Sequence, residues 1–223
     1  YETIINADLS DNLVGENTLS KNELLNLVPW PEILNMDITG LTPLEYMLYI
    51  FYTALPPRRL DFKYLKLIKL TAEDPAPKLS KKFNYLVINS FGIPSKLIYN
   101  NYKTSKIYGQ FVIDLNLNDK TFFYYSLVSE AVLNWLKTTE TKTDELIFPT
   151  LAGEVYDGFS KNINKIFRYF EPKLISANVL RHAFLTHIHK QSDITSNTLK
   201  EIAQYMGNSV AEGLNYRKFK VVE

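Results

Sequence analysis

The chain has 223 residues, a formal net charge of +1 and no cysteine. Its length allows a sizeable hydrophobic core, and the lack of cysteine excludes disulfides, thiol catalysis and thiolate metal sites. Because the net charge is close to zero, any nucleic-acid binding must depend on a local basic face. No apolar run reaches the roughly 18 residues that predict a membrane span, so we expect no membrane partner.

The chain begins with a polar, weakly periodic stretch at residues 1–28, which predicts a linker or arm. Residues 29–223 are expected to form one domain, and its first short helix is expected to begin at Trp30. The run TPLE at residues 42–45 is typical of a helix start, with an N-cap threonine, a proline at the first helical position and a capping-box glutamate. That helix must end at Pro56-Pro57, since proline is incompatible with a continuing helix.

Two arginines follow this helix stop directly. Arg58 and Arg59 are succeeded by the run LDFKYLKLIKL, which predicts a second helix at residues 60–70. Two arginines at a proline-forced corner between buried helices indicate a functional position. The alternatives are exposure to solvent or an ion pair with Asp61 or Glu45.

A small sheet is expected after a loop at residues 71–82. Three β-rich segments predict its strands, at residues 84–89, 96–99 and 108–115. The second connection is a hairpin loop that holds Lys103 and Lys106, which are either solvated or presented to a ligand. Amphipathic patterns then predict helices at residues 121–137 and 160–170. This order predicts an α+β, mainly α fold with a three-stranded antiparallel sheet at one edge.

The closing stretch, residues 178–218, concentrates polar groups on predicted helices. Its first helix places four residues on one face at helical spacing: Asn178, Arg181, His182 and Leu185. The second helix stops at Gly207, and a capping box, S-x-x-E at residues 209–212, starts a short helix that carries Tyr216. We therefore expect packed helices to bring together an arginine, the corner residue Asn208 and a tyrosine.

Four motifs follow one another along the chain, and no one of them is specific alone. They are the arginine box TALPPRRLDFKYL, which fits R-x-x-E/D-L-x-x-L with Arg58; the hairpin lysine of Tyr102-Lys103-Thr104; Asn178 to Arg181 in place of H-x-x-R; and Met206-Gly207-Asn208-Ser209 followed by Tyr216. Together they span roughly residues 30–220. In this order they resemble the catalytic domain of the tyrosine recombinases of phage-integrase type, close to variants from viruses and mobile elements.

The resemblance implies phosphoryl transfer on DNA. Tyr216 would attack a phosphodiester and form a covalent phosphotyrosine. Arg58 and Arg181 would clamp the negative charge of the transition state, and Lys103 would protonate the leaving 5′-oxygen. A 5′-hydroxyl of a partner strand would then resolve the intermediate. Further DNA contacts are expected from three residues: Arg59, Lys106 and His182.

Two positions depart from the family pattern. Asn178 and Asn208 stand where the family usually has histidine, and asparagine can hydrogen-bond a phosphate oxygen but cannot accept a proton. Simpler interpretations also remain open: Asn178 could cap its helix, Asn208 could serve the turn, and Tyr216 could be one more packed tyrosine.

The resemblance also implies partners and excludes cofactors. We expect double-stranded DNA as the partner, a homotetramer on DNA and mostly monomer in isolation, with the family's upstream DNA-clamping domain absent from this chain. No cofactor is expected, and no metal, because the three histidines of residues 182–189 do not share one helix side. The alternatives are a degenerate relative that binds DNA without cutting it and a type IB-like topoisomerase.

Overall fold

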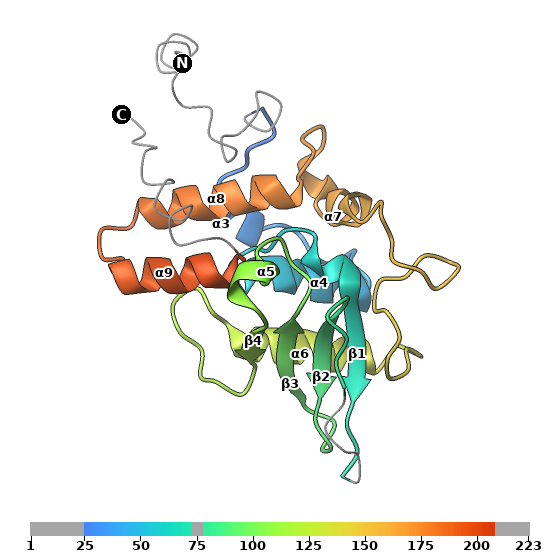
Figure 1. The fold of residues 1–223 in the computed structure, drawn as a ribbon. Coiled ribbons are helices and arrows are strands. Elements are labelled where there is room, and N and C mark those ends of the chain that lie inside the picture. Colours follow the sequence, from blue (N-terminus) through green and yellow to red (C-terminus); the bar gives the residue numbers. More distant parts are fainter. Residues whose placement is uncertain (1–24, 73–77, 208–223) are drawn as a thin grey trace.

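A computed structural model of the chain describes residues 25–72 and 78–207. Seven α-helices lie in these ranges: α3 (Trp30–Leu34), α4 (Pro43–Thr53), α5 (Ser105–Tyr108), α6 (Tyr125–Leu136), α7 (Ser160–Ile166), α8 (Ala177–His189) and α9 (Ser196–Tyr205). Two 3-10 helices and four strands accompany them: η1 (Asp61–Tyr64), η2 (Arg168–Phe170), β1 (Leu65–Lys69), β2 (Asn84–Ile88), β3 (Pro94–Tyr99) and β4 (Phe111–Asp114). In Figure 1 the sheet lies in front of α6, and α8 and α9 run side by side across the upper part of the molecule.

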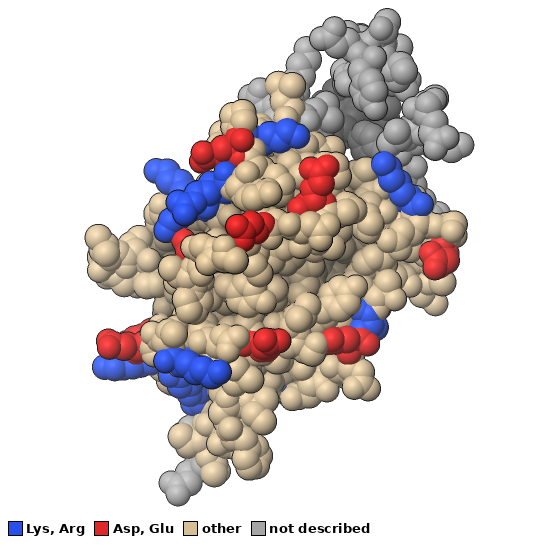
Figure 2. All heavy atoms as spheres, turned by 180° about the vertical axis from the view of Figure 1, so that it is seen from behind, with Lys and Arg blue, Asp and Glu red and all other residues tan. Residues whose placement is uncertain are grey.

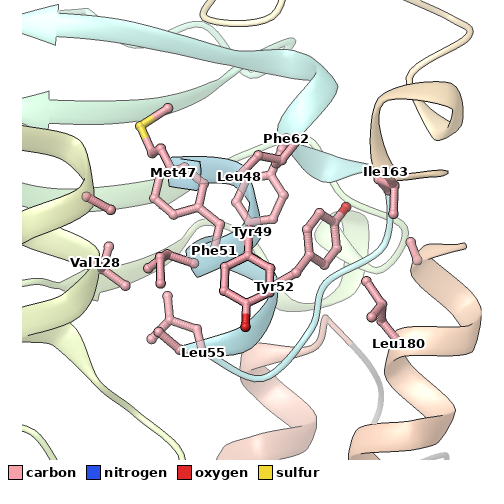
Figure 3. Packing of buried hydrophobic residues seen from close by; sticks show 14 of the residues in the cluster. Met47, Leu48, Tyr49, Phe51, Tyr52, Leu55, Phe62, Val128, Ile163 and Leu180 are labelled. Atoms are coloured by element: carbon pink, nitrogen blue, oxygen red, sulfur yellow. The ribbon is translucent and has the colours of Figure 1, made fainter. Parts of the chain in front are cut away.

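Helix α4 is the centre of the hydrophobic core. Its residues from Met47 to Thr53 are all buried, and it packs against α6 and α7. Figure 3 shows its side chains meeting residues from three other segments, namely Phe62, Val128 and Leu180. Burial of a large apolar side chain contributes roughly 1.5–3 kcal/mol, so α4 holds the sheet layer and the helical layer together.

The start of α4 confirms the predicted capping box. The backbone N–H of Glu45 donates to the Thr42 hydroxyl at 3.3 Å, and the Thr42 N–H donates to the Glu45 carboxylate at 2.9 Å. The helix ends at Thr53, before the two prolines, as predicted. The predicted short helix at Trp30 is also present as α3.

The sheet differs from the expected one. It has four strands in the order β1-β2-β3-β4, not three, and β1 runs parallel to β2 while the other pairs are antiparallel. The predicted helix at residues 60–70 is wrong, because this segment forms η1 followed by β1. The described fold is therefore mixed α/β.

Residues 65–69 form a strand because their hydrogen-bond and packing partners are distant in sequence. Leu65 and Leu67 enter the main core, while Ile68 on the opposite face joins a second cluster with residues of β2 and β3. The edge of β1 that faces away from β2 forms hydrogen bonds with residues 144–147. For example, the Leu67 N–H donates to the Glu145 carbonyl at 3.0 Å. The apolar spacing of this run fits a helix as well as a strand covered on two faces, and the sheet decides between them.

Other boundaries shift for local reasons. The predicted strand at residues 108–115 begins only at Phe111, because α5 occupies the end of the β3–β4 connection. The helix predicted at 121–137 begins at Tyr125, where the Asp119 carboxylate accepts from the Ser126 N–H at 2.8 Å. The helix predicted at 160–170 ends at Ile166 and continues as η2.

The face opposite to that of Figure 1 carries side chains of both charges. Figure 2 shows its lysines and arginines interspersed with aspartates and glutamates rather than gathered in one patch. This face therefore offers no single-sign surface for a phosphate backbone. Within residues 25–72 and 78–207, no helix has the length and apolar character needed to span a bilayer.

Candidate functional site

Arg58 is a buried arginine whose guanidinium is held by three kinds of contact. Its side chain is 2% exposed, and its Nε donates to the Asp61 carboxylate at 2.8 Å. Its Nη1 donates to the backbone carbonyl of Tyr205 at the end of α9. The Cζ atom lies 3.9 Å from the ring centroid of Tyr99, in cation–π geometry. Of the two sequence alternatives for an ion pair, the structure forms the one with Asp61.

Arg181 reaches the same point from the middle of α8. Its side chain is 1% exposed, and its Nη1 donates to the Met206 carbonyl at 2.9 Å and to the Pro57 carbonyl at 3.3 Å. The two guanidiniums thus bind neighbouring carbonyls where α9 ends. Carbonyls at a helix C-terminus carry partial negative charge, which favours cations there. We call Arg58, Arg181 and the turn at Met206–Gly207 the two-arginine site.

Gly207 closes this turn in a conformation that favours glycine. Its φ is +67°, and a Cβ there would lie 3.0 Å from Nη2 of Arg58 and 3.3 Å from the ring of Tyr102. The Thr104 hydroxyl donates to the Gly207 carbonyl at 3.0 Å. The β3–β4 loop therefore contacts the turn through the residues on either side of Lys103, whose own side chain is exposed.

One donor of the two-arginine site has no hydrogen-bond partner in the described part of the chain. Nη2 of Arg58 is buried without an acceptor there, while the rings of Tyr99 and Tyr102 lie within cation–π range of the same guanidinium. Buried polar atoms are almost always hydrogen-bonded, so an orphaned one calls for an explanation. An anionic oxygen beside Gly207 would supply the missing acceptor.

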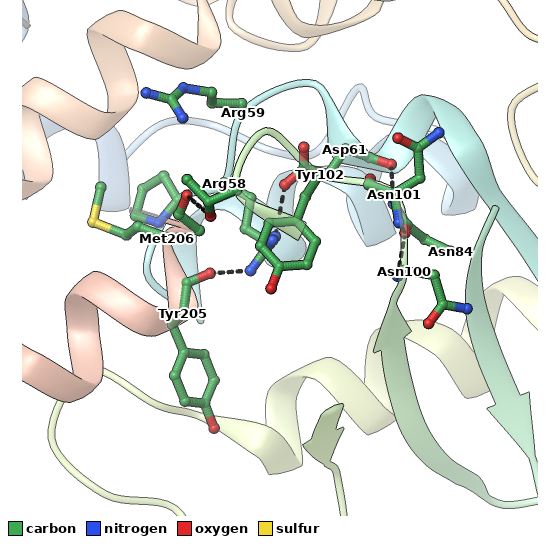
Figure 4. A network of polar contacts seen from close by, with 12 residues as sticks. Arg58, Arg59, Asp61, Asn84, Asn100, Asn101, Tyr102, Tyr205 and Met206 are labelled. Carbon is green, nitrogen blue, oxygen red and sulfur yellow. Dashed lines mark hydrogen bonds and ion pairs between the residues drawn. The ribbon is translucent and has the colours of Figure 1, made fainter. Parts of the chain in front are cut away.

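Asn84 joins the arginine segment to the lysine loop. Its side-chain amide donates to the carbonyls of Asp61 at 2.8 Å and Asn101 at 3.0 Å. Its Oδ1 accepts from the N–H groups of Asn100 at 2.9 Å and Asn101 at 2.8 Å (Figure 4). The residue is fully buried. Sequence reasoning missed it, although asparagine at the head of a β-rich run is unusual enough to be a signal.

The tyrosines next to the two-arginine site are packed and protonated. Burial raises the pKa of Tyr205, and its hydrogen bond with Tyr125, 2.5 Å between hydroxyl oxygens, raises it further. Burial likewise raises the pKa of Tyr99 and of Tyr52, whose hydroxyl donates to the Arg59 carbonyl at 2.7 Å. These hydroxyls are therefore poor nucleophiles at neutral pH.

The side chain of Arg59 points away from the turn at Met206–Gly207. Figure 4 shows its side chain pointing toward α8, in the direction opposite to that of Arg58. It lines a cleft of about 310 Å³ together with Ser160 at the start of α7, Asn178 at the start of α8, and Arg181. Asn178 does not cap its helix, because the cap is Ser176, whose hydroxyl accepts from the Val179 N–H at 3.2 Å.

The remaining predicted residues are not part of this arrangement. Lys106 is exposed on α5, and His182 is 4% exposed inside α8, which argues against direct contact of its ring with DNA. The predicted polar face of this helix is thus largely buried. Asn208 and Tyr216 lie outside the described residues. Among the described ones, no three side chains of His, Asp or Glu are grouped so that they could hold a metal ion.

The fold described above, a mixed sheet covered by helices, has a counterpart among solved structures. It is similar to the crystal structure of XerA recombinase, with a TM-score of 0.51 and 15% sequence identity. The match covers 95% of this chain and 63% of the XerA chain, so this chain spans less than two thirds of that protein's length. The chain therefore has a recombinase-like fold. No protein-family model and no curated protein matches its sequence.

Proposed function

We propose that this chain is the catalytic domain of a site-specific DNA recombinase that cuts and rejoins strands through a covalent 3′-phosphotyrosine. The observation that carries the proposal is the two-arginine site. Arg58 and Arg181, named by the sequence motifs, are 123 positions apart and donate to adjacent carbonyls at one helix end. The recombinase-like fold supports the same reading.

The chemistry suits this placement. Displacement at a phosphodiester spreads negative charge over the nonbridging oxygens, and fixed guanidinium donors stabilise that charge. Arginine is suited to the task because its planar donors stay charged. The buried Nη2 of Arg58, which has no acceptor in the described ranges, is a donor available to one such oxygen.

The remaining roles follow from the sequence motifs. Tyr216 attacks the phosphorus and releases its hydroxyl proton to water; a bond forms between its oxygen and phosphorus, and the bond to the 5′-oxygen breaks. Lys103, exposed on the loop that contacts Gly207 through Thr104, delivers a proton to that leaving oxygen. Asn178 and Asn208 donate hydrogen bonds to the nonbridging oxygens.

The proposed partner is double-stranded DNA, on which four copies of the chain assemble. In isolation we expect a monomer. Light scattering coupled to gel filtration tests this expectation. A tetramer at micromolar concentration without DNA contradicts it. A monomer without DNA, together with a complex of four copies when DNA is added, supports it.

A specific observation favours a second candidate, a relative that binds DNA without cutting it. Both arginines already donate to backbone carbonyls of the protein, and both positions where the family usually has histidine are asparagine. The site would then be a rigid phosphate receptor that lacks a proton acceptor.

Covalent trapping separates the two candidates. The protein is incubated with labelled duplexes that carry a nick inside randomised sequence, so that the short cleaved fragment diffuses away and the intermediate accumulates. A protein–DNA band that survives denaturation is expected for the parent and for Tyr169→Phe, an exposed tyrosine of η2 that serves as control. The band should be absent for Tyr216→Phe.

Each outcome is informative. A band that persists in Tyr216→Phe removes the proposed nucleophile, and the absence of a band with a duplex that binds favours the non-cutting relative. When the band depends on Tyr216, transfer of the trapped strand to a second labelled duplex distinguishes a recombinase from a type IB-like topoisomerase.

A further inference from the structure

The cleft lined by Arg59 holds a guanidinium that the proposed function leaves unused. It lies between the first residues of α7 and α8, and its lining includes Arg59, Ser160, Ser176, Ala177, Asn178 and Arg181. No carboxylate is among these residues, whereas two guanidiniums are. The cleft is therefore a positively charged hollow with hydroxyl and amide donors in its wall.

Arg59 has an unusual environment for an arginine. Its Nη1 is shielded from solvent and has no hydrogen-bond partner among the described residues, and it forms no ion pair there. Its backbone is fixed, because the buried Tyr52 hydroxyl donates to its carbonyl. A guanidinium beside a hollow, with one N–H group that lacks an acceptor among the described residues, is suited to binding an anion.

The start of α8 provides a second attraction for an anion in the cleft. The N-cap Ser176 uses its hydroxyl on the Val179 N–H, so the cap is formed and the helix axis points its positive end into the cleft. This 13-residue helix is long enough for its dipole to act on a ligand at Ala177 and Asn178. The guanidinium, the helix end and the hydroxyls together match a tetrahedral oxyanion.

We propose that this cleft is a second phosphate site, in which Arg59 is the main ligand. Given the proposed function, on which this assignment of the source depends, the phosphate is a DNA backbone phosphate next to the one at the two-arginine site. The neighbouring residues Arg58 and Arg59 then hold two phosphates of one strand, and this fixes the register of the strand at the point of attack. A free phosphate ion has the same chemistry and is the alternative source.

The first arm of the test measures inorganic phosphate alone. Binding is followed by the rise in unfolding temperature with phosphate concentration for the parent, Arg59→Gln and Arg168→Gln. Arg168 is an exposed arginine of η2 and serves as the matched control. We expect a smaller rise in Arg59→Gln than in the parent, because only the two-arginine site can then bind phosphate, and a rise like that of the parent in Arg168→Gln. An equal rise in all three proteins overturns the site.

The second arm measures affinity for a 30-base-pair duplex at several salt concentrations. Loss of one charged phosphate contact should weaken binding roughly tenfold and lower the salt slope by about one. We expect this for Arg59→Gln but not for Arg168→Gln, and Arg59→Lys should restore the slope. An unchanged slope in Arg59→Gln overturns the second backbone phosphate and leaves the recombinase proposal intact.

The two arms separate the two proposals. If the parent binds no DNA, the recombinase proposal and the DNA source of the phosphate both fail, while the phosphate arm still decides the cleft. If Arg59→Gln fails to fold, Arg59→Lys takes its place in both arms: a loss of phosphate affinity with an unchanged salt slope supports the site, and no change in either overturns it.

Discussion

Two carboxylates, one in the first turn of α4 and one beyond its end, have different kinds of partner. Glu45, in its first turn, accepts from the Thr42 N–H and pairs with Lys165, whose side chain is 62% exposed. Asp61, beyond the end of the helix, is 7% exposed and pairs with Arg58, which also donates to the carbonyl of Tyr205, 147 positions away. The first carboxylate stabilises a local feature on the surface, and the second anchors a buried site.

The difference predicts how each region responds to change. A surface ion pair competes with water and contributes about 0–1 kcal/mol. A buried pair depends strongly on both members, because removal of one leaves the other desolvated and uncompensated. The two-arginine site should therefore tolerate substitution poorly, while the start of α4 tolerates it well.

The largest effect is expected for Arg58→Ala. The substitution leaves the Asp61 carboxylate buried without its cation, which should lower the free energy of unfolding by about 3–5 kcal/mol. Arg59→Ala, one residue further on and without an ion pair in the described ranges, should change it by less than about 0.5 kcal/mol. Urea unfolding followed by circular dichroism measures both.

A double variant sharpens the contrast. Replacing the pair by apolar residues, Arg58→Met with Asp61→Leu, should recover most of the lost stability, because neither charge remains buried alone. Equal losses in Arg58→Ala and Arg59→Ala would show that the buried pair is not the source of the effect.

Asn84→Ala comes next in size. It removes a fully buried amide that makes four hydrogen bonds to η1 and to the start of the β3–β4 loop. Unsatisfied buried partners cost about 1–3 kcal/mol, so we expect a loss of about 2–3 kcal/mol in the free energy of unfolding. Amide hydrogen exchange should also speed up at Asn100 and Asn101. Asn116→Ala, an exposed asparagine, is the control, and unchanged exchange at the two loop amides would refute the assigned role.

Gly207→Ala probes the turn itself. A left-handed residue other than glycine costs about 1–2 kcal/mol, and a Cβ at Gly207 also meets the Arg58 guanidinium at 3.0 Å. Gly92 has a similar φ of +77° but open space around it, so Gly92→Ala reports the backbone cost alone. We expect Gly207→Ala to lower the melting temperature more than Gly92→Ala does. Equal shifts would mean that the turn and Arg58 are not in contact.

The same contrast explains what the sequence could predict. The start of α4 was predicted correctly because its capping contacts join residues three apart. Arg58 and Arg181 could be singled out because their motifs are short, and the structure brings the two side chains together at the end of α9. Strand β1 was missed because its partners, β2 and residues 144–147, are remote in sequence. Two further sets of contacts were missed for the same reason: those between Asn84 and the β3–β4 loop, and the hydrogen bond from Thr104 to Gly207.

The smallest effect is expected at Glu45, and it depends on pH. Burial tends to raise the pKa of this carboxyl, but the hydrogen bonds from Lys165 and Thr42 outweigh burial and hold it below its usual value. Its stabilisation is therefore present above the unfolded pKa of about 4.3 and is lost as the pH falls through the lower folded pKa. Glu45→Gln keeps the capping hydrogen bonds and removes only the charge.

We thus expect Glu45→Gln to lower the free energy of unfolding by about 0.5 kcal/mol at pH 7 and to match the parent near pH 3. Glu140→Gln, an exposed carboxylate without an ion pair in the described ranges, should match the parent at both pH values. Urea unfolding at each pH measures the difference. A loss at pH 7 as large as that of Arg58→Ala would contradict the contrast, because a surface pair with an exposed lysine would then matter as much as the buried pair.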